Sequence, residues 1–441
     1  MKLNIAEAFP IIRTHEGAPA RRINAEMELR RSVMSCMLWE SEFYESGKTI
    51  ATRIADLVPQ VKPEYVAGIA VEARSKMKLR HVPLLLVREM ARHKSHRPYV
   101  RATLATVIQR ADELAEFLAI YWKDGKQPIA KSVQRGLSDA FTKFSSYDLA
   151  KYNHDGPIKL RDVLFLSHAK PESEAQAATW KQLVDDTLPI PDTWEVAISA
   201  TKDKRAEWTR LLQEGKLGAL ALLRNLRNMQ DANVEANLIR EALRNIKTER
   251  VLPFRFIAAI RYGKQFAPEL DQAMLKCTAE LPKLSGTTAV LVDVSGSMYG
   301  RPLSAKSDMD RSDAAAGLAI LTREVCENPR VFTFSLKLEE VPTYRGLALA
   351  NAVHTSQKHD ATYLGKAIAQ LSNSVKYDRL IVITDEQSHD TVPNPLPGTR
   401  GYVINVASNK NGIGYGPWMH IDGWSERVLD YINLYEQMGE K

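Results

Sequence analysis

The stretch that decides the fold of the last third of the chain is Thr288-Ala-Val-Leu-Val-Asp-Val-Ser-Gly-Ser297. Its first five residues form an apolar, β-rich run, which predicts a buried strand. The carboxylate of Asp293 and the hydroxyls of Ser295 and Ser297 follow at the carboxyl end of that strand. Ligands of open α/β sheets collect at this end of the strands. The stretch therefore predicts an α/β domain with a polar site at the edge of its sheet.

Two later residues extend this polar site. Thr362 precedes the helical stretch 364–372, and Asp385 directly follows a second apolar run at 380–384. Hydroxyl and carboxylate oxygens suit Mg²⁺, which keeps several waters and leaves an open position for a partner's Asp or Glu. A polar turn without a ligand is the alternative for the loop after the first strand alone. The predicted ligands of a divalent cation, Mg²⁺, are Asp293, Ser295, Ser297, Thr362 and Asp385.

The last third of the chain alternates between strand-like and helical patterns. Apolar runs lie at 288–293, 330–335, 379–384 and 401–407, and helical patterns lie at 309–327, 364–375 and 425–437. This alternation predicts a doubly wound, mostly parallel sheet with helices on both faces, over residues 285–441.

The first two thirds show helix after helix and no strand signal. Apolar residues recur every three or four positions in the ranges 100–121, 129–144, 174–184, 217–229, 234–246 and 254–266. Short breaks with Pro or Gly separate these ranges, so neighbouring helices should pack as antiparallel hairpins. We predict an all-α, HEAT-like repeat domain over residues 1–284, although the sequence has no strict period.

Length and composition narrow the class of protein. A chain of 441 residues exceeds one typical core, so it is expected to be multidomain. No apolar stretch approaches the ~20 residues of a membrane span, and the first residues lack the apolar core of a signal peptide, so we expect a cytoplasmic protein. The three cysteines, Cys36, Cys277 and Cys326, lie far apart, which suits a reducing compartment and excludes a CxxC zinc site.

The charge is unevenly distributed. Residues 1–284 carry 45 Lys and Arg against 35 Asp and Glu, whereas residues 285–441 carry 15 against 18. A basic domain beside a mildly acidic one indicates a polyanionic partner, most plausibly nucleic acid. A merely solvated basic surface is the alternative.

Several motifs resemble known families. The loop at 293–297, with Thr362 and Asp385 in the same order, resembles the metal-ion-dependent adhesion site of a von Willebrand factor A domain. The stretches Leu160-Arg-Asp-Val-Leu-Phe-Leu-Ser-His-Ala-Lys-Pro171 and Gly218-Ala-Leu-Ala-Leu-Leu-Arg-Asn-Leu-Arg-Asn-Met229 resemble segments of the Ro autoantigen family. The helical part of that family is the TROVE domain, and the chain looks like a compact bacterial or phage-type member.

The resemblance implies a fold and a function. The TROVE repeats would form a monomeric ring closed by the A domain, and the protein would bind RNA without catalysis, in RNA quality control or processing. The implied partners are Y-like noncoding RNA on the outer surface, single-stranded 3′ ends in the cavity, and an RNA-processing exonuclease such as polynucleotide phosphorylase. No membrane partner is expected.

The resemblance also implies RNA-contacting residues. His168 matches the family's RNA-contacting histidine, Lys170 lies beside it, and Lys151 matches a basic stretch of the relatives. A histidine can stack on a base or donate to a phosphate, and a lysine adds a positive charge. Without the resemblance, His168 reads as a histidine that caps a helix end. Asn153 and Asp155 stand where relatives are basic, which weakens the expectation of Y RNA binding there.

Two further basic groups are candidates. Lys131 and Arg135 are four residues apart, so they share one face of a predicted helix and could follow phosphates. The densest basic run, at 88–97, contributes Arg92, Lys94 and Arg97. An ordinary solvated helix surface explains either group almost as well.

Two other classes of function stay open at this point. The chain could be a Mg²⁺-dependent protein-interaction adaptor without specific RNA binding. A metal-dependent nuclease has less support, because hydrolysis commonly uses clustered carboxylates around the metal, whereas the predicted site is rich in hydroxyls.

Overall fold

The computed structural model describes residues 24–35, 47–77, 79–248, 251, 253–279, 281, 283–300, 309–407, 417–422, 428–429, 432–433 and 436. The chain divides into two compact units, which are taken one at a time below. The helical unit contains residues 25–33 and 48–207, and the mixed unit contains the other described residues, nearly all of them from Trp208 onward.

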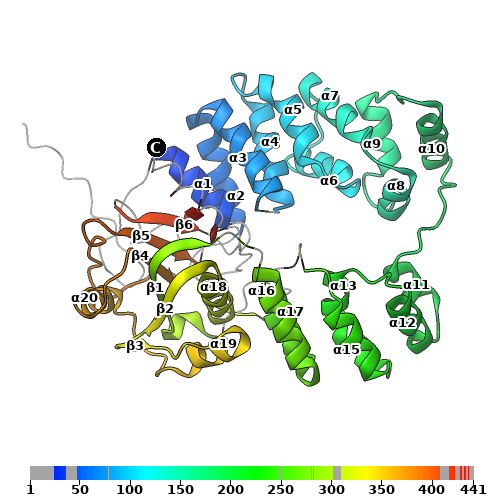
Figure 1. Cartoon of the computed structure of the whole chain (residues 1–441). Helices are drawn as coiled ribbons and strands as arrows, with labels where there is room; N and C mark the ends of the chain where they lie inside the picture. Colours follow the sequence, from blue (N-terminus) through cyan, green and yellow to red (C-terminus); the bar gives the residue numbers. More distant parts are fainter. Residues whose placement is uncertain are drawn as a thin grey trace, which may run out of the picture. The chain divides into compact units, whose positions relative to one another are not determined.

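The helical unit is built from short helices joined by short loops (Figure 1). Ser145 and Asp148 form a capping box at the start of α8, and Ser173 caps α10. The bounds are α1 Ala25–Ser35, α2 Gly47–Leu57, α3 Pro63–Ser75, α4 His81–Arg92, α5 Arg97–Val107, α6 Asp112–Tyr121, α7 Lys131–Phe141, α8 Ser146–Tyr152, α9 Leu160–Ser167, α10 Glu174–Val184 and α11 Trp194–Ala200, with α12 Lys204–Gln213 crossing into the next unit.

Neighbouring helices of this unit pack in pairs, including α3 with α4 and α5, α5 with α7, and α7 with α9. The approach of α5 and α7 is close at Gly136, where an added Cβ would meet the carbonyl oxygen of Arg101 and the Cβ of Leu104, both at 3.0 Å. Apolar side chains such as Phe117, Leu137 and Phe141 are fully buried between the helices. Contacts of α3 with α5, of α5 with α7 and of α7 with α9 join every second helix, which is the packing of a helical repeat.

The single helix predicted over 100–121 is wrong. It is interrupted at residues 108–111 by the buried ion pair of Arg74 and Glu113, whose closest atoms are 2.6 Å apart. Nε of Arg74 donates to the carbonyl oxygen of Val107 at 2.9 Å, and Oε2 of Glu113 accepts from the backbone nitrogens of Gln109 and Arg110 at 2.8 and 3.1 Å. The pair therefore satisfies backbone groups at both sides of the break.

The mixed unit begins with helices and continues into an α/β region. The helix predicted over 217–229 is divided at Asn225, whose side chain donates to the carbonyl oxygen of Ala221 at 2.9 Å, so that prediction is also wrong. The helices are α13 Ala219–Arg224, α14 Leu226–Asp231, α15 Ala236–Arg244, α16 Pro253–Ile260 and α17 Ala267–Ala279, followed in the α/β region by α18 Arg311–Val325, α19 Gly346–Thr355 and α20 Leu364–Ser374.

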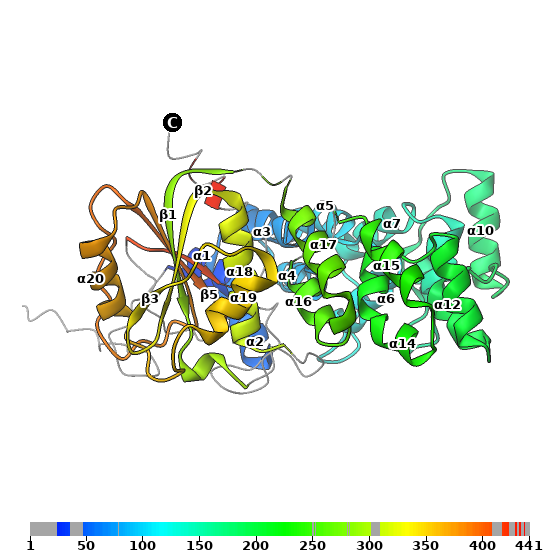
Figure 2. The same cartoon turned by 60° about the horizontal axis from the view of Figure 1, so that its bottom comes forward.

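The described strands of the mixed unit form one six-stranded sheet in the order β3-β2-β1-β4-β5-β6. All neighbours are parallel except β2 and β3. Figure 2 shows α20 on one side of the sheet and α18 with α19 on the other. This arrangement confirms the predicted doubly wound, mostly parallel sheet. The strands are β1 Leu284–Asp293, β2 Cys326–Phe334, β3 Leu338–Glu340, β4 Arg379–Thr384, β5 Arg400–Asn405 and β6 Met419–Asp422.

Three elements of the α/β region were not predicted: β3, α19 and β6. The helix predicted at 425–437 lies largely outside the described residues. Helix α19 begins where Oδ1 of Asp271, on α17, accepts from the backbone nitrogen of Leu347 at 2.8 Å. Arg261 follows α16 and pairs with Asp313 of α18, so α16 and α17 pack directly on the α/β region. In the described parts of the chain, no helix is long and apolar enough to cross a membrane.

Candidate functional site

The predicted metal ligands lie at the end of β1 and in the loops beside it. Asp293 is fully buried; its Oδ1 accepts from the backbone nitrogen of Ser295 at 2.8 Å, and its Oδ2 accepts from the hydroxyl of Thr384 at 2.6 Å. The hydroxyl oxygens of Ser295 and Ser297 lie 3.4 Å apart. Parallel pairing of β1 with β4 brings Asp385 to the same edge of the sheet.

Thr362 reaches this edge from another loop. The backbone nitrogen of Gly296 donates to the carbonyl oxygen of Asp360 at 2.9 Å, which ties the loop before α20 to the loop after β1. Thr362 is buried, and its carbonyl oxygen accepts from the backbone nitrogen of His389 at 2.9 Å. The structure thus brings the five predicted ligands into three adjoining loops at one edge of the sheet.

The loop after β4 is held in place from behind Asp385. Glu386 has left-handed backbone geometry, with φ of 60°, and is fully buried. Its carboxylate accepts from Nδ2 of Asn405 at 3.3 Å and lies against the imidazole of His420. Strands β5 and β6 therefore support the position of Asp385.

Two buried carboxylates and a buried arginine set the electrostatics of these loops. Burial, followed by the charge of Asp385, raises the pKa of Asp293 to about 7. Nη1 of Arg311, a buried residue of α18, lies 3.2 Å from Oδ2 of Asp385 and 3.3 Å from the carbonyl oxygen of Ser297. Among the described residues, no three His, Cys, Asp or Glu side chains cluster at metal-binding distance. A cation here would therefore depend on the hydroxyls of Ser295, Ser297 and Thr362 as well as on carboxylates.

Sequence reasoning missed Arg311. It lies in the predicted helix 309–327, ahead of the apolar stretch Ala314–Ile320. The available signal was an arginine in the first turn of a helix that is otherwise apolar enough to be buried. A buried arginine needs a buried acidic or polar partner.

Four of the predicted RNA-contacting residues lie on one surface of the helical unit, which we call the α7–α9 face. Lys131 and Arg135 are exposed on α7, and between them Nε2 of Gln134 donates to the carbonyl oxygen of Leu166 on α9 at 3.1 Å. His168 ends α9 in left-handed geometry, with φ of 53°, and its side chain is exposed, as is that of Lys170. The contact through Gln134 places all four near the end of α9.

Lys151 lies on α8 beside aromatic rings. Its Nζ is 5.8 Å from the ring centroid of Tyr147 and 5.6 Å from that of Tyr152. The side chain of Tyr147 is 51% exposed, so its ring is open to a ligand. Asn153 donates to Asp186 at 3.2 Å, and Asp155 pairs with Lys159.

The residues of the dense basic run differ in their environments. Arg92 pairs with Asp124 at 2.7 Å and with Glu89 at 3.4 Å. Nε of Arg97 donates to the carbonyl oxygen of Ala91 at 3.1 Å, and Lys94 is exposed. The charge of Arg92 is therefore largely neutralised within the helical unit, whereas the charges of Lys94 and Arg97 have no acidic partner among the described contacts.

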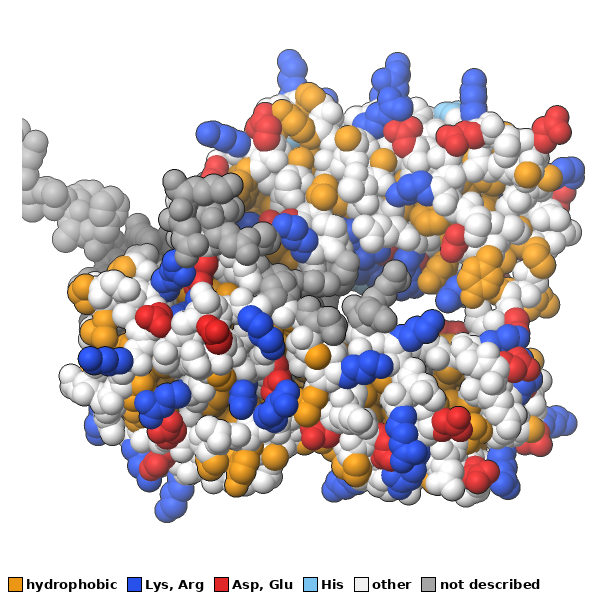
Figure 3. Space-filling model, viewed as in Figure 1, with side chains coloured by type: hydrophobic (Ala, Val, Ile, Leu, Met, Phe, Trp, Pro, Cys, Tyr) orange, Lys and Arg blue, Asp and Glu red, His pale blue; other side chains and the backbone are white. Residues whose placement is uncertain are grey.

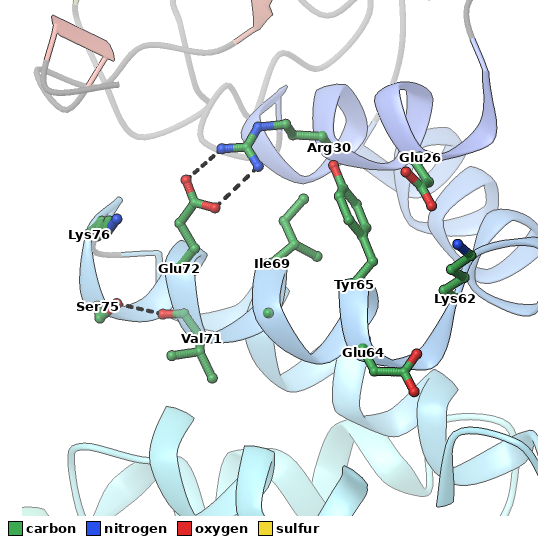
Figure 4. Close-up of a pocket in the computed structure, with 11 residues that line it drawn as sticks. Glu26, Arg30, Lys62, Glu64, Tyr65, Ile69, Val71, Glu72, Ser75 and Lys76 are labelled. Carbon is green, nitrogen blue, oxygen red and sulfur yellow. Dashed lines mark hydrogen bonds and ion pairs between the residues drawn. The ribbon is translucent and has the colours of Figure 1, made fainter. Parts of the chain in front are cut away.

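Two cavities lie away from these residues. A groove of about 750 Å³ between α1 and α3 has Arg30 facing Glu72 across it (Figure 4), with Nη1 of Arg30 3.1 Å from Oε2 of Glu72. Acidic and basic side chains balance along this groove, which does not favour a polyanion. A second cavity of about 820 Å³ is lined by residues of α12, α13 and α15 and the loops between them.

Comparison with known proteins agrees with this architecture. The TROVE domain model matches residues 9–187 and 186–361. The solved structure of the RO (RSR) protein of Deinococcus radiodurans matches with a TM-score of 0.64 and 17% identity, over 91% of this chain and 97% of that chain.

Telomerase protein component 1 also matches. The protein from Rattus norvegicus is 22% identical over 409 residues, 70% of this chain, and the protein from Mus musculus is 22% identical over 428 residues, 74% of this chain. The matched parts are only 15% and 16% of those longer proteins. Because the family model covers most of the chain, the predicted resemblance is confirmed: the chain belongs to the TROVE domain family and has the fold of a Ro protein.

Proposed function

We propose that this chain is a non-catalytic RNA-binding protein of Ro type. It would bind single-stranded 3′ ends and Y-like noncoding RNA, and act as a scaffold in RNA quality control or processing. The observation that carries the proposal is the α7–α9 face, where Lys131, Arg135, His168 and Lys170 are all exposed in a member of the TROVE domain family.

The chemistry of the α7–α9 face suits RNA. Lys131, Arg135 and Lys170 can each neutralise a phosphate, and the imidazole of His168 can stack on a base or donate to a phosphate oxygen. Phe165, 59% exposed on the last turn of α9, offers an aromatic surface beside that histidine.

We expect single-stranded ends to bind more tightly than Y-like RNA. A structured RNA needs a broad basic surface, whereas the surface beside Lys151 contains Asp155 and also Asp186, which accepts a hydrogen bond from Asn153. Lys151 could still contact the phosphate of one nucleotide while its base stacks on the ring of Tyr147.

The α/β region would add a metal-dependent contact as a von Willebrand factor A domain. Asp293, Ser295, Ser297, Thr362 and Asp385 would hold Mg²⁺, which supplies an open coordination position for an acidic group. A processing exonuclease such as polynucleotide phosphorylase would be a partner of the complex. The proposal places the protein in the cytoplasm, as a monomeric ring.

The test is RNA binding by the purified chain. We expect a single-stranded oligonucleotide to bind with an affinity that falls steeply as salt rises, because several phosphates are neutralised together. Labelled RNA should stay intact in the presence of Mg²⁺. Absent binding, or affinity that does not change with salt, would contradict the proposal, and cleavage that disappears in Asp293→Ala would indicate a nuclease.

The second candidate is a Mg²⁺-dependent adaptor for acidic protein partners. It is favoured by the pairing of Arg88 and Arg92 with Asp124, since these pairs remove basic charge from the surface. Asp293→Ala should then abolish capture of the partner and leave RNA binding unchanged.

A further inference from the structure

The loop between α6 and α7, residues 122–130, has a fixed backbone. The hydroxyl of Tyr121 accepts from the backbone nitrogen of Ala130 at 3.3 Å, which brings the two ends of the loop together. The backbone nitrogen of Gly125 donates to the carbonyl oxygen of Trp122 at 2.9 Å, and Gly125 has φ of 120°, a value that favours glycine. The loop is therefore ordered before any ligand binds.

The indole ring of Trp122 has one face at the surface of this loop. Its Nε1 donates to the carbonyl oxygen of Gln127 at 2.7 Å, so the ring is held across the loop. Nζ of Lys126 lies 5.3 Å from the ring centroid, in cation–π geometry. Because Lys126 is exposed, the ring face that it covers borders solvent. A base that displaces this ammonium group meets a flat aromatic surface that is already oriented.

Two lysines beside the ring have charges that no acid neutralises. Lys123 and Lys126 are exposed, and neither has an acidic partner among the described residues. The acid between them, Asp124, pairs instead with Arg88 and Arg92 of α4. Its carboxylate is therefore directed to α4 and leaves both ammonium groups open to phosphates.

The arginines of α4 account for the acids at this end of the helical unit. Glu89 pairs with Arg88 and Arg92, the same two arginines that hold the acid of the loop. Two acids therefore balance two arginines, and the lysine charges remain for a ligand. The loop leads directly into Lys131, the exposed first residue of α7. The two lysines thus continue the basic surface of the α7–α9 face.

We propose that the α6–α7 loop binds one nucleotide of single-stranded RNA, with its base stacked on Trp122 and the phosphates on either side of it held by Lys123 and Lys126. On binding, Lys126 leaves the ring for a phosphate, and the base takes its place. This contact requires an unpaired base, so a double helix does not make it. An acidic protein segment would satisfy the lysines but not the ring. The inference rests on the proposed RNA binding and adds a stacking contact to it.

The experiment measures the affinity of the full chain for a short oligouridylate over a series of salt concentrations. We expect Trp122→Leu to weaken binding about tenfold with an unchanged salt dependence, as for the loss of one stacked base. Trp122→Phe keeps a ring and should weaken binding about threefold or less. Lys123→Gln combined with Lys126→Gln should make the slope of log affinity against log salt shallower by about 1.4, which corresponds to two phosphate contacts.

The matched control is the double variant Lys202→Gln, Lys204→Gln. These two lysines of the helical unit are also exposed and also stand on either side of an aspartate, Asp203, but neither contacts an aromatic ring among the described residues. The control removes the same two charges and should leave the slope unchanged. Equal changes of slope in the two double variants indicate nonspecific attraction to net charge and overturn the inference.

A second measurement needs no substitution and therefore does not depend on the folding of a variant. The unmodified chain is photocrosslinked to the same oligonucleotide carrying 5-iodouridine, and the crosslinked peptides are identified by mass spectrometry. We expect a crosslink on the peptide that contains Trp122. Its absence, or an unchanged affinity in a folded Trp122→Leu variant, overturns the inference.

Two further outcomes separate this loop from its rivals. If inorganic polyphosphate displaces the RNA equally well from the unmodified chain and from Trp122→Leu, the loop binds anions without contacting a base, and the inference fails. If the loop variants bind like the unmodified chain, while combined replacement of Lys131, Arg135 and Lys170 by alanine weakens binding, the proposed function stands and only the inference is overturned.

Discussion

Replacing Lys131, Arg135 and Lys170 together by alanine should reduce both the affinity for single-stranded RNA and its dependence on salt. All three side chains are exposed, and none has an acidic partner among the contacts of the described residues. Their charges are therefore available to phosphates. Each phosphate contact with a single strand contributes about 0.7 to the slope of log affinity against log salt, so the slope should become shallower by about 2.

The loss of affinity follows from the same relation. At an ionic strength near 0.1 M, release of one counterion contributes about 1 kcal/mol, or roughly a fivefold change in affinity. Three independent contacts then give a loss of about a hundredfold. Fluorescence anisotropy of a labelled oligonucleotide across a series of salt concentrations measures the slope and the affinity together.

The matched control is Arg330→Ala in the α/β region. Arg330 forms a two-bond ion pair with Glu340, at 2.8 and 2.7 Å, so its charge is already neutralised. Arg330→Ala should therefore change neither the affinity for RNA nor its dependence on salt. An unchanged slope in the triple variant, with folding intact by circular dichroism, would refute the assignment of RNA to the α7–α9 face. Equal losses in both variants would instead indicate nonspecific attraction to net charge.

Three further changes test the fold and the metal site. Glu113→Gln breaks the buried pair with Arg74 and should lower the free energy of unfolding by about 3 to 5 kcal/mol in urea titrations, whereas Arg101→Ala, at an exposed pair, should cost about 1 kcal/mol or less. Gly136→Ala forces α5 and α7 apart and should cost about 1 to 3 kcal/mol, while Gly68→Ala in the open middle of α3 should be neutral or stabilising. Because the pKa of Asp293 is raised, the metal-free fold holds a proton there below pH 7 and becomes less stable as pH rises towards 7. Mg²⁺ competes with that proton, so it should raise the melting temperature more at pH 8 than at pH 6. An equal or opposite difference would contradict this explanation.

The sequence predicted best those strands and helices whose own residues show a clear apolar pattern. Strands β1, β4 and β5 each have an apolar stretch of three or four residues, because both faces of the sheet are covered, and Asp293 and Asp385 come at the carboxyl ends of two of them. Short edge strands carry no such pattern: β3 reads Leu-Glu-Glu, which is as typical of a loop as of a strand.

The errors come from contacts between distant residues. At the break at 108–111, Glu113 accepts locally from the backbone of Gln109 and Arg110, but its partner Arg74 is 39 positions away, and periodicity alone does not indicate either contact. The start of α19 depends in the same way on Asp271, 76 positions before Leu347. Helix ends of this kind depend on residues far away in the sequence, so local periodicity does not predict them.

The pairing of individual side chains narrows the candidates for the proposed RNA surface more than the excess of basic residues over acidic ones does. Figure 3 shows Lys and Arg interspersed with Asp and Glu over the visible face. Arg88 and Arg92 come from the densest basic run of the sequence, yet both contact Asp124, and an arginine that must leave a carboxylate to bind a phosphate gains little. Lys131 and Lys170 come from sparser stretches but have no such competitor among the described contacts. Basic residues without an acidic neighbour should therefore contribute most to RNA binding. Arg92→Ala should weaken RNA binding less than Lys170→Ala does, although Arg92 lies in the more basic segment.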